Sequence, residues 1–84
     1  MAENWRPGQG LPIERLYAWV ATEPDGGEGL CSVTTLALGT MPLIGADRER
    51  IESLRPHAEI TRKLTGYPVR LVRFLRTDVM EELP

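Results

Sequence analysis

The segment PVRLVRFLR, residues 68–76, decides how this chain folds, because it places an arginine at every third position inside an apolar run. A period of three belongs to neither a strand nor an α-helix. Pro68 ahead of the run and the β-branched Val69 and Val72 within it favour a strand. Alternate residues of a strand point to opposite faces, so the arginines divide between the two faces. One face would carry Arg70, Val72, Phe74 and Arg76, and the other Val69, Leu71, Arg73 and Leu75.

The position of Arg73 predicts which face of this strand is turned toward the core. Arg73 would lie between two leucines if its own face were covered, and a buried unpaired charge is strongly destabilising. If the other face is turned inward, Val72 and Phe74 fill the centre of the core. Arg70 and Arg76 can then extend their guanidinium groups into solvent past the edges of the helix that covers this face. We therefore expect Val69, Leu71, Arg73 and Leu75 on an open face of the sheet.

Two further strands precede this segment. Residues 13–23, IERLYAWVATE, are aromatic and β-branched, which is typical of a strand. The sequence PDGG at 24–27 is suited to a tight turn, since proline favours its first central position and glycine accepts a positive φ. Residues 29–38, GLCSVTTLAL, are then predicted to form a second strand that returns beside the first. Pro42 and Gly45 predict a loop over 39–46.

A helix is predicted from Asp47, which can cap its first turn, to Gly66, which can end it. Its apolar face recurs at helical spacing. Pro56 interrupts this pattern, because an interior proline costs roughly 3 kcal/mol. We expect a kink or break over 53–56, with Ser53 as a second cap. The predicted apolar face comprises Ile51, Leu54, Ala58, Thr61 and Leu64.

These elements predict an α+β fold, a small two-layer ββαβ domain. Its three-stranded sheet, mixed or antiparallel, has one kinked helix on one face. The first strand is the most apolar and is placed in the middle, with the second and third strands on either side. We expect a flexible arm over 1–12 whose Trp5 docks on a neighbour or stays idle, a single domain over 13–76 and an acidic tail over 77–84.

The composition argues against several classes of protein. Cys31 and His57 are the only cysteine and histidine, which excludes an internal disulfide framework and a Cys/His zinc site. Cys31 is mid-strand and His57 near the helix surface, so no nucleophile and base are brought together. No signal peptide or membrane span is evident. We expect a cytoplasmic, non-enzymatic protein with no cofactor and no membrane partner.

Two surfaces are candidates for function. The open face predicted above would be covered by a second copy, because large apolar patches are rare on soluble monomers. Its interface candidates are Tyr17, Trp19, Val69, Leu71, Arg73 and Leu75.

The charge distribution gives the second surface. Residues 1–46, 47–76 and 77–84 carry net charges of −3, +4 and −3, which sum to −2. The basic block could contact phosphates, or it could be a solvated surface that pairs with the interleaved acids. Its patch candidates are Arg55, Arg62, Lys63, Arg70 and Arg76. The leading hypothesis is a homodimer that binds an unknown protein. A nucleic-acid-binding module and a ligand-binding or catalytic pocket at a dimer seam are the alternatives.

Overall fold

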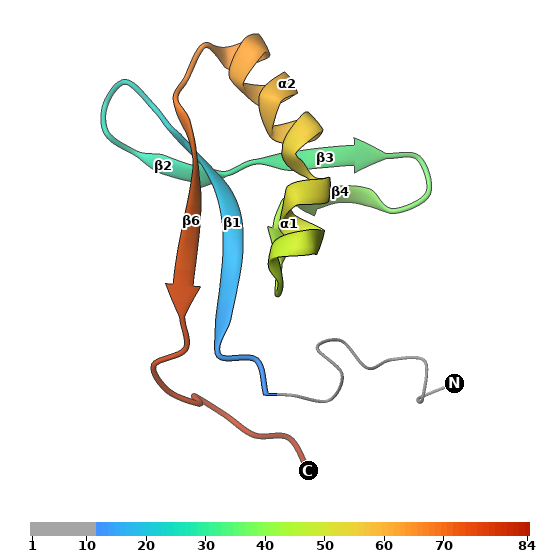
Figure 1. The fold of residues 1–84 in the computed structure, drawn as a ribbon, viewed down its shortest axis with the longest axis vertical. Coiled ribbons are helices and arrows are strands. Elements are labelled where there is room, and N and C mark those ends of the chain that lie inside the picture. Colours follow the sequence, from blue (N-terminus) through green and yellow to red (C-terminus); the bar gives the residue numbers. More distant parts are fainter. Residues whose placement is uncertain (1–11) are drawn as a thin grey trace.

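The computed structural model describes residues 12–84 (Figure 1), so all but the last residue of the predicted arm, including Trp5, lies outside the described residues. The described chain is an α+β fold of antiparallel strands and two short helices. In chain order the elements are β1 Arg15–Thr22, β2 Glu28–Leu30, β3 Ser32–Thr35, β4 Gly39–Pro42, β5 Ile44–Gly45, α1 Arg48–Ser53, α2 Arg55–Thr65 and β6 Val69–Leu75.

Strand β1 is the centre of the main sheet, as its apolar sequence predicts. One edge of β1 pairs with β6 over seven consecutive positions, from Arg15 opposite Leu75 to Ala21 opposite Val69. The other edge is shared by β2 and β5. All of these pairs are antiparallel, and the sheet has four strands rather than the three predicted.

Three backbone segments meet at Trp19, and this junction was not predicted. The Trp19 N–H donates to the Leu43 carbonyl at 3.1 Å, the Leu43 N–H donates to the Cys31 carbonyl at 2.8 Å, and the Cys31 N–H donates to the Trp19 carbonyl at 2.9 Å. This closed ring of hydrogen bonds separates β2 from β3 and β4 from β5. The hairpin of β3 and β4 therefore leaves the main sheet and projects away from β1 (Figure 1).

Two predictions for this part of the chain were wrong. The single strand expected over 29–38 is divided at Cys31 and ends at Thr35. The loop expected over 39–46 contains β4 and β5. Gly39 has a φ of 71°, which lets the chain reverse after the exposed turn and pair with β3.

The helical region is broken at Leu54, inside the predicted interval. Asp47 caps α1 as expected, because its side chain accepts a hydrogen bond from the Arg50 N–H at 2.8 Å. Pro56 lies in the first turn of α2, where its missing N–H leaves no helical bond unmade. The second cap was predicted wrongly: Leu54 occupies that position, and Ser53 donates instead to the Arg50 carbonyl. Gly66 ends α2 with a φ of 74°, as predicted.

The core lies between the helices and one face of the sheet. Trp19 is its largest member, and its indole N–H donates to the carbonyl of the fully buried Ile51 at 3.0 Å. Leu71, which is opposite Trp19, packs against this core, as does Val69. The remaining buried members of the cluster are Cys31, Leu43, Leu54 and Ala58.

The predicted orientation of the third strand is therefore wrong. Val69 and Leu71 face the helices, whereas Val72 and Phe74 lie on the open side. Arg73 shares the covered face but is exposed, because it is opposite Tyr17, beyond the buried Trp19 and its partner Leu71. Leu64 was also assigned to the core and is 81% exposed near the end of α2.

Candidate functional site

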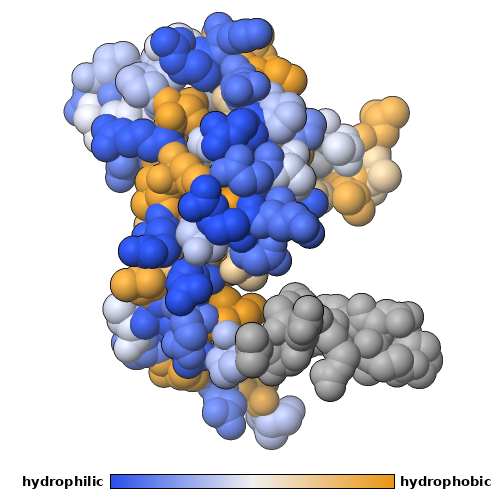
Figure 2. Space-filling model, viewed as in Figure 1, coloured by the Kyte–Doolittle hydropathy of each residue, from blue (hydrophilic) through white to orange (hydrophobic). Residues whose placement is uncertain are grey.

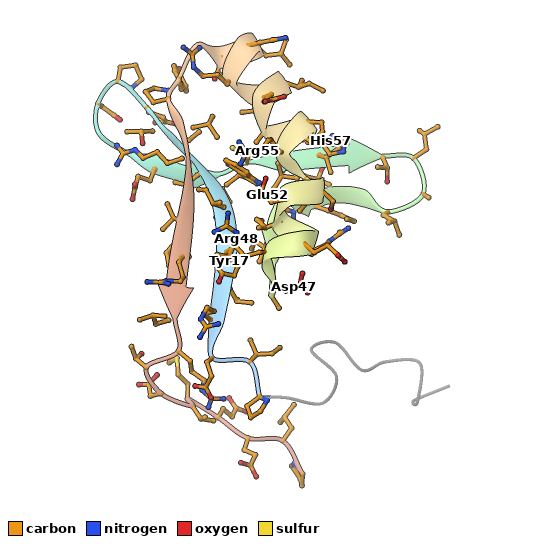
Figure 3. The ribbon with its side chains drawn as sticks, viewed as in Figure 1. Tyr17, Asp47, Arg48, Glu52, Arg55 and His57 are labelled. Atoms are coloured by element: carbon orange, nitrogen blue, oxygen red, sulfur yellow. The ribbon has the colours of Figure 1, made fainter. Side chains whose placement is uncertain are left out.

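The interface candidates on β1 are covered by arginines of the two helices. The Arg55 guanidinium lies over the Trp19 ring at 4.8 Å from its centroid, and Arg48 lies over Tyr17 at 5.8 Å. Glu52 joins the two arginines, with contacts of 3.2 Å to Arg48 and 2.8 Å to Arg55 (Figure 3). Trp19 is only 5% exposed, so this face is not open at its centre.

The charged cluster over β1 is held together by complementary charge. The hydrogen bond from Arg55 is the main cause that lowers the pKa of Glu52, with a further contribution from Arg48. The same bond raises the pKa of Arg55. Because a guanidinium attracts an aromatic ring, each arginine stabilises both the carboxylate and the ring beneath it. This arrangement belongs to the fold and leaves Arg55 engaged within the chain.

The face of the main sheet opposite the helices carries several exposed apolar side chains. Along β1 it presents Leu16, Ala18 and Val20, which are paired with Phe74, Val72 and Arg70 of β6. Leu16, Leu30 and Phe74 are 41%, 50% and 50% exposed. Between them Ala18 and Val20 are buried, so the centre of this face is closely packed. From here on we call this side of the sheet the open face, although it carries Val72 and Phe74, which the sequence predicted to face the helix. It is defined by Leu16, Ala18, Val20, Leu30, Ile44, Val72 and Phe74.

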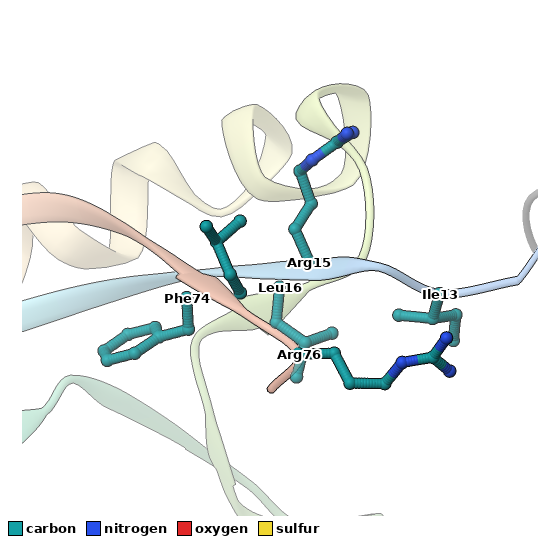
Figure 4. Close-up of a pocket in the computed structure, with 6 residues that line it drawn as sticks. Ile13, Arg15, Leu16, Phe74 and Arg76 are labelled. Carbon is teal, nitrogen blue, oxygen red and sulfur yellow. The ribbon is translucent and has the colours of Figure 1, made fainter. Parts of the chain in front are cut away.

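One end of the open face is hollowed into a groove of about 420 Å³. Leu16 and Phe74 line the groove from adjacent strands, and Ile13 closes one end (Figure 4). Arg15, Leu75 and Arg76 complete the lining. Arg76 contacts Glu14 at 3.2 Å, and both of these side chains are about half exposed. The groove thus combines an apolar floor with the Arg76 guanidinium at one end (Figure 4).

A second exposed apolar feature is the tip of the hairpin formed by β3 and β4. Leu36 is fully exposed and Leu38 is 68% exposed. The tip is the orange group that projects from the body in Figure 2, whereas apolar and charged groups alternate over β6. Leu36 was predicted to lie within a strand, and its exposure at a turn was not predicted, because this turn is fixed by the pairing of β3 with residues 39–42.

The basic-patch candidates do not converge on one surface. Arg55 lies over Trp19 on the helix side, and Arg62 and Lys63 are in the last turn of α2. Arg70 faces the opposite side of the sheet beside Val20, and Arg76 is paired with Glu14 at the end of that side. Contacts with a nucleic acid backbone favour cations that follow one continuous path, and these five residues are divided between two faces.

Cys31 borders a smaller cavity of about 260 Å³ between β2, β3 and the end of α2. The thiol is buried, and this burial raises its pKa, with the Thr61 side chain partly opposing the shift. A thiol with a raised pKa is a poor nucleophile at neutral pH. Within residues 12–84 no group of three His, Cys, Asp or Glu side chains could hold a metal ion. The helices of this region are also too short and too polar to cross a membrane.

The comparisons with known proteins add no assignment to this geometry. No family model, no curated protein and no solved structure matches the chain.

Proposed function

We propose that this protein acts by binding another protein through its open face and performs no chemistry of its own. The observation that carries the proposal is the exposure of Leu16, Leu30 and Phe74 on one face of the main sheet, while the described helices cover the other face. Contiguous exposed apolar side chains around a packed centre are typical of a protein-binding surface.

The charges around the open face favour a particular class of partner. Arg70 and Arg76 lie at its margin, and Glu14 offsets only Arg76. An acidic segment with apolar side chains would bury those side chains against Leu16 and Phe74 and place its carboxylates beside the arginines. Arginine suits this arrangement, since its planar group can contact a carboxylate and an apolar surface together.

The experiment that tests this proposal is site-specific photo-crosslinking in the cells that produce the protein. A benzophenone amino acid replaces Leu16 in one variant and Leu30 in a second. The control variant carries the same group in place of Glu59, an exposed residue of α2. We expect both open-face variants, and not the control, to give an adduct with the same foreign protein at an acidic, apolar peptide.

A competing substitution makes the result specific to the face. Leu16→Glu in the variant that carries the probe at residue 30 should reduce the adduct at least ~10-fold, because it places a carboxylate within the apolar contact. Adducts with nucleic acid, adducts formed equally by the control, or no adduct at all would each contradict the proposal.

A further inference from the structure

Strand β6 has one edge that no strand within residues 12–84 covers. Its other edge is paired with β1 along its whole length. The Arg76 N–H donates to the Glu14 carbonyl, and the Pro68 carbonyl accepts from Thr22, so the even-numbered positions point their backbone groups toward β1. Backbone groups alternate in direction along a strand. Those of Val69, Leu71, Arg73 and Leu75 therefore point to the free edge.

The segment that follows β6 has the opposite charge. Residues 70–76 contain three arginines and no acid, and residues 77–84 contain Asp78, Glu81 and Glu82 and no base. This tail makes no helix or strand, and it exposes Val79, Met80 and Leu83 by 67%, 93% and 82%. A free strand edge favours pairing with another chain, and exposed apolar side chains favour burial.

The tail is poorly suited to fold back on β6 of its own chain. Tight hairpin turns depend on glycine or asparagine for positive φ, and neither occurs between residues 67 and 84. The tail therefore needs a second molecule to pair with β6. The chain itself supplies a match, because the acids at 78 and 81 have the same spacing as the arginines at 73 and 76.

We propose that two copies of the chain pair through β6 and the tail, antiparallel, about a two-fold axis at Thr77. Each tail then becomes a strand on the free edge of β6 in the other copy. This pairing places Arg73 opposite Glu81 of the second copy and Arg76 opposite Asp78 of the second copy. It places apolar residues opposite one another as well: Leu71 with Leu83, Phe74 with Met80 and Leu75 with Val79.

The register is selected by charge. Two residues that are directly opposite across an antiparallel edge both point their backbone groups toward that edge or both away from it. Because this direction alternates along the strand, the two residues are both odd-numbered or both even-numbered. Each symmetric register is therefore identified by the sum of the two residue numbers in a pair, which is constant and even. Among such symmetric registers, only the sum of 154 places two arginines directly opposite acids. A shift to a sum of 152 instead places Arg76 opposite itself, and like charges directly opposite are destabilising. One mismatch remains, Val72 opposite Glu82.

The pairing also fits the groove of the open face. Phe74 is half exposed in its lining, and the Met80 side chain of the second copy would lie beside it. Methionine packs favourably against an aromatic ring. The interface candidates Leu71, Arg73 and Leu75 thus contribute through the edge of β6 and not through an open sheet face. The two main sheets would become one continuous sheet with an open face on each half.

Charge reversal at one predicted pair tests this proposal. Arg73 and Glu81 are both exposed, so neither substitution disturbs the core. Wild-type protein should sediment as a dimer at about 50 µM, and Arg73→Glu or Glu81→Arg should each raise the dimer dissociation constant at least ~10-fold. Each single variant contains two repulsive contacts per dimer. Lys63→Glu and Glu59→Arg reverse exposed charges on α2 and should sediment like the wild type.

Mixing the two variants gives the decisive result. A mixed dimer of one Arg73→Glu chain and one Glu81→Arg chain contains two attractive contacts, as does the dimer of the Arg73→Glu, Glu81→Arg double variant. We expect equal amounts of the two monomeric variants to form a 1:1 dimer, and the double variant to dimerise as the wild type does. A monomeric wild type at about 100 µM, dimers unaffected by the single reversals, or a mixture that stays monomeric would each overturn the proposal.

Discussion

Trp19→Phe is expected to destabilise the protein by roughly 2–3 kcal/mol, the sum of two losses. The indole N–H donates to the Ile51 carbonyl at 3.0 Å, and such a bond contributes about 1 kcal/mol. That carbonyl also accepts from the Leu54 N–H at 3.2 Å, so the substitution does not leave it without a partner. The smaller ring removes buried apolar surface from a residue that is 5% exposed, which adds roughly 1–2 kcal/mol.

The measurement is urea unfolding followed by far-ultraviolet circular dichroism at one fixed protein concentration. For a chain of this size, a loss of roughly 2–3 kcal/mol lowers the midpoint by about 2 M urea with an unchanged slope. Tyr17→Phe is the matched control, because it keeps an aromatic ring beneath Arg48 and removes only the hydroxyl of a half-buried residue. We expect the control to change stability by less than ~0.5 kcal/mol. An equally small loss for Trp19→Phe would refute the role given to the indole at the junction of β1, α1 and α2.

Two further predictions concern Glu52 and Gly45. The arginines lower the pKa of Glu52 below its usual 4.5 in the folded protein, so its contribution to stability is present above that pH and is lost as the pH falls through the lowered value. Glu52→Gln should therefore flatten the acid side of the stability profile measured by thermal unfolding from about pH 6 to pH 3, and an unchanged slope would contradict this. Gly45→Ala should cost ~1–3 kcal/mol, because its added carbon would meet the Ile51 backbone nitrogen at 3.2 Å and the Arg50 side chain at 2.9 Å. Gly29→Ala enters open space and should be almost neutral in the same urea titration, so equal losses for the two variants would count against the close approach of β5 to α1.

Local chemistry was sufficient to predict the elements whose ends are set by a single residue. The cap at Asp47, the break near Pro56 and the end at Gly66 all depend on backbone groups within one turn of helix. The central position of β1 was also predicted, because β1 is the most apolar and aromatic of the strands. These features required no knowledge of contacts distant in sequence.

The division of the second strand could not be predicted in this way. Residues 29–38 have continuous strand propensity, and the break at Cys31 arises from backbone bonds to Trp19 and Leu43. The covered face of β6 was misassigned for a related reason. Alternation shows which residues share a face, but the extent of the helices decides which of them are buried. Arg73 avoids burial because it lies beyond Trp19 and Leu71, so the cost of burying an arginine did not discriminate between the two orientations.

The three-residue spacing of the arginines has a simpler explanation at the free edge of β6 than within a core. Arg73 and Arg76 lie on opposite faces of the strand, and so do Asp78 and Glu81 in a tail that continues it. The two-fold rotation about Thr77 brings both Arg73 and Arg76 opposite an acid on the same face, so the three-residue spacing produces a charge pair on each face of the proposed dimer. The same rotation places Arg70 opposite Pro84. A proline at that even-numbered position removes no bond between the two copies, because its nitrogen would point away from the shared edge. The three-residue spacing of the arginines, which matches the period of neither a strand nor a helix, thus matches the proposed antiparallel pairing of β6 and the tail in two copies of the chain.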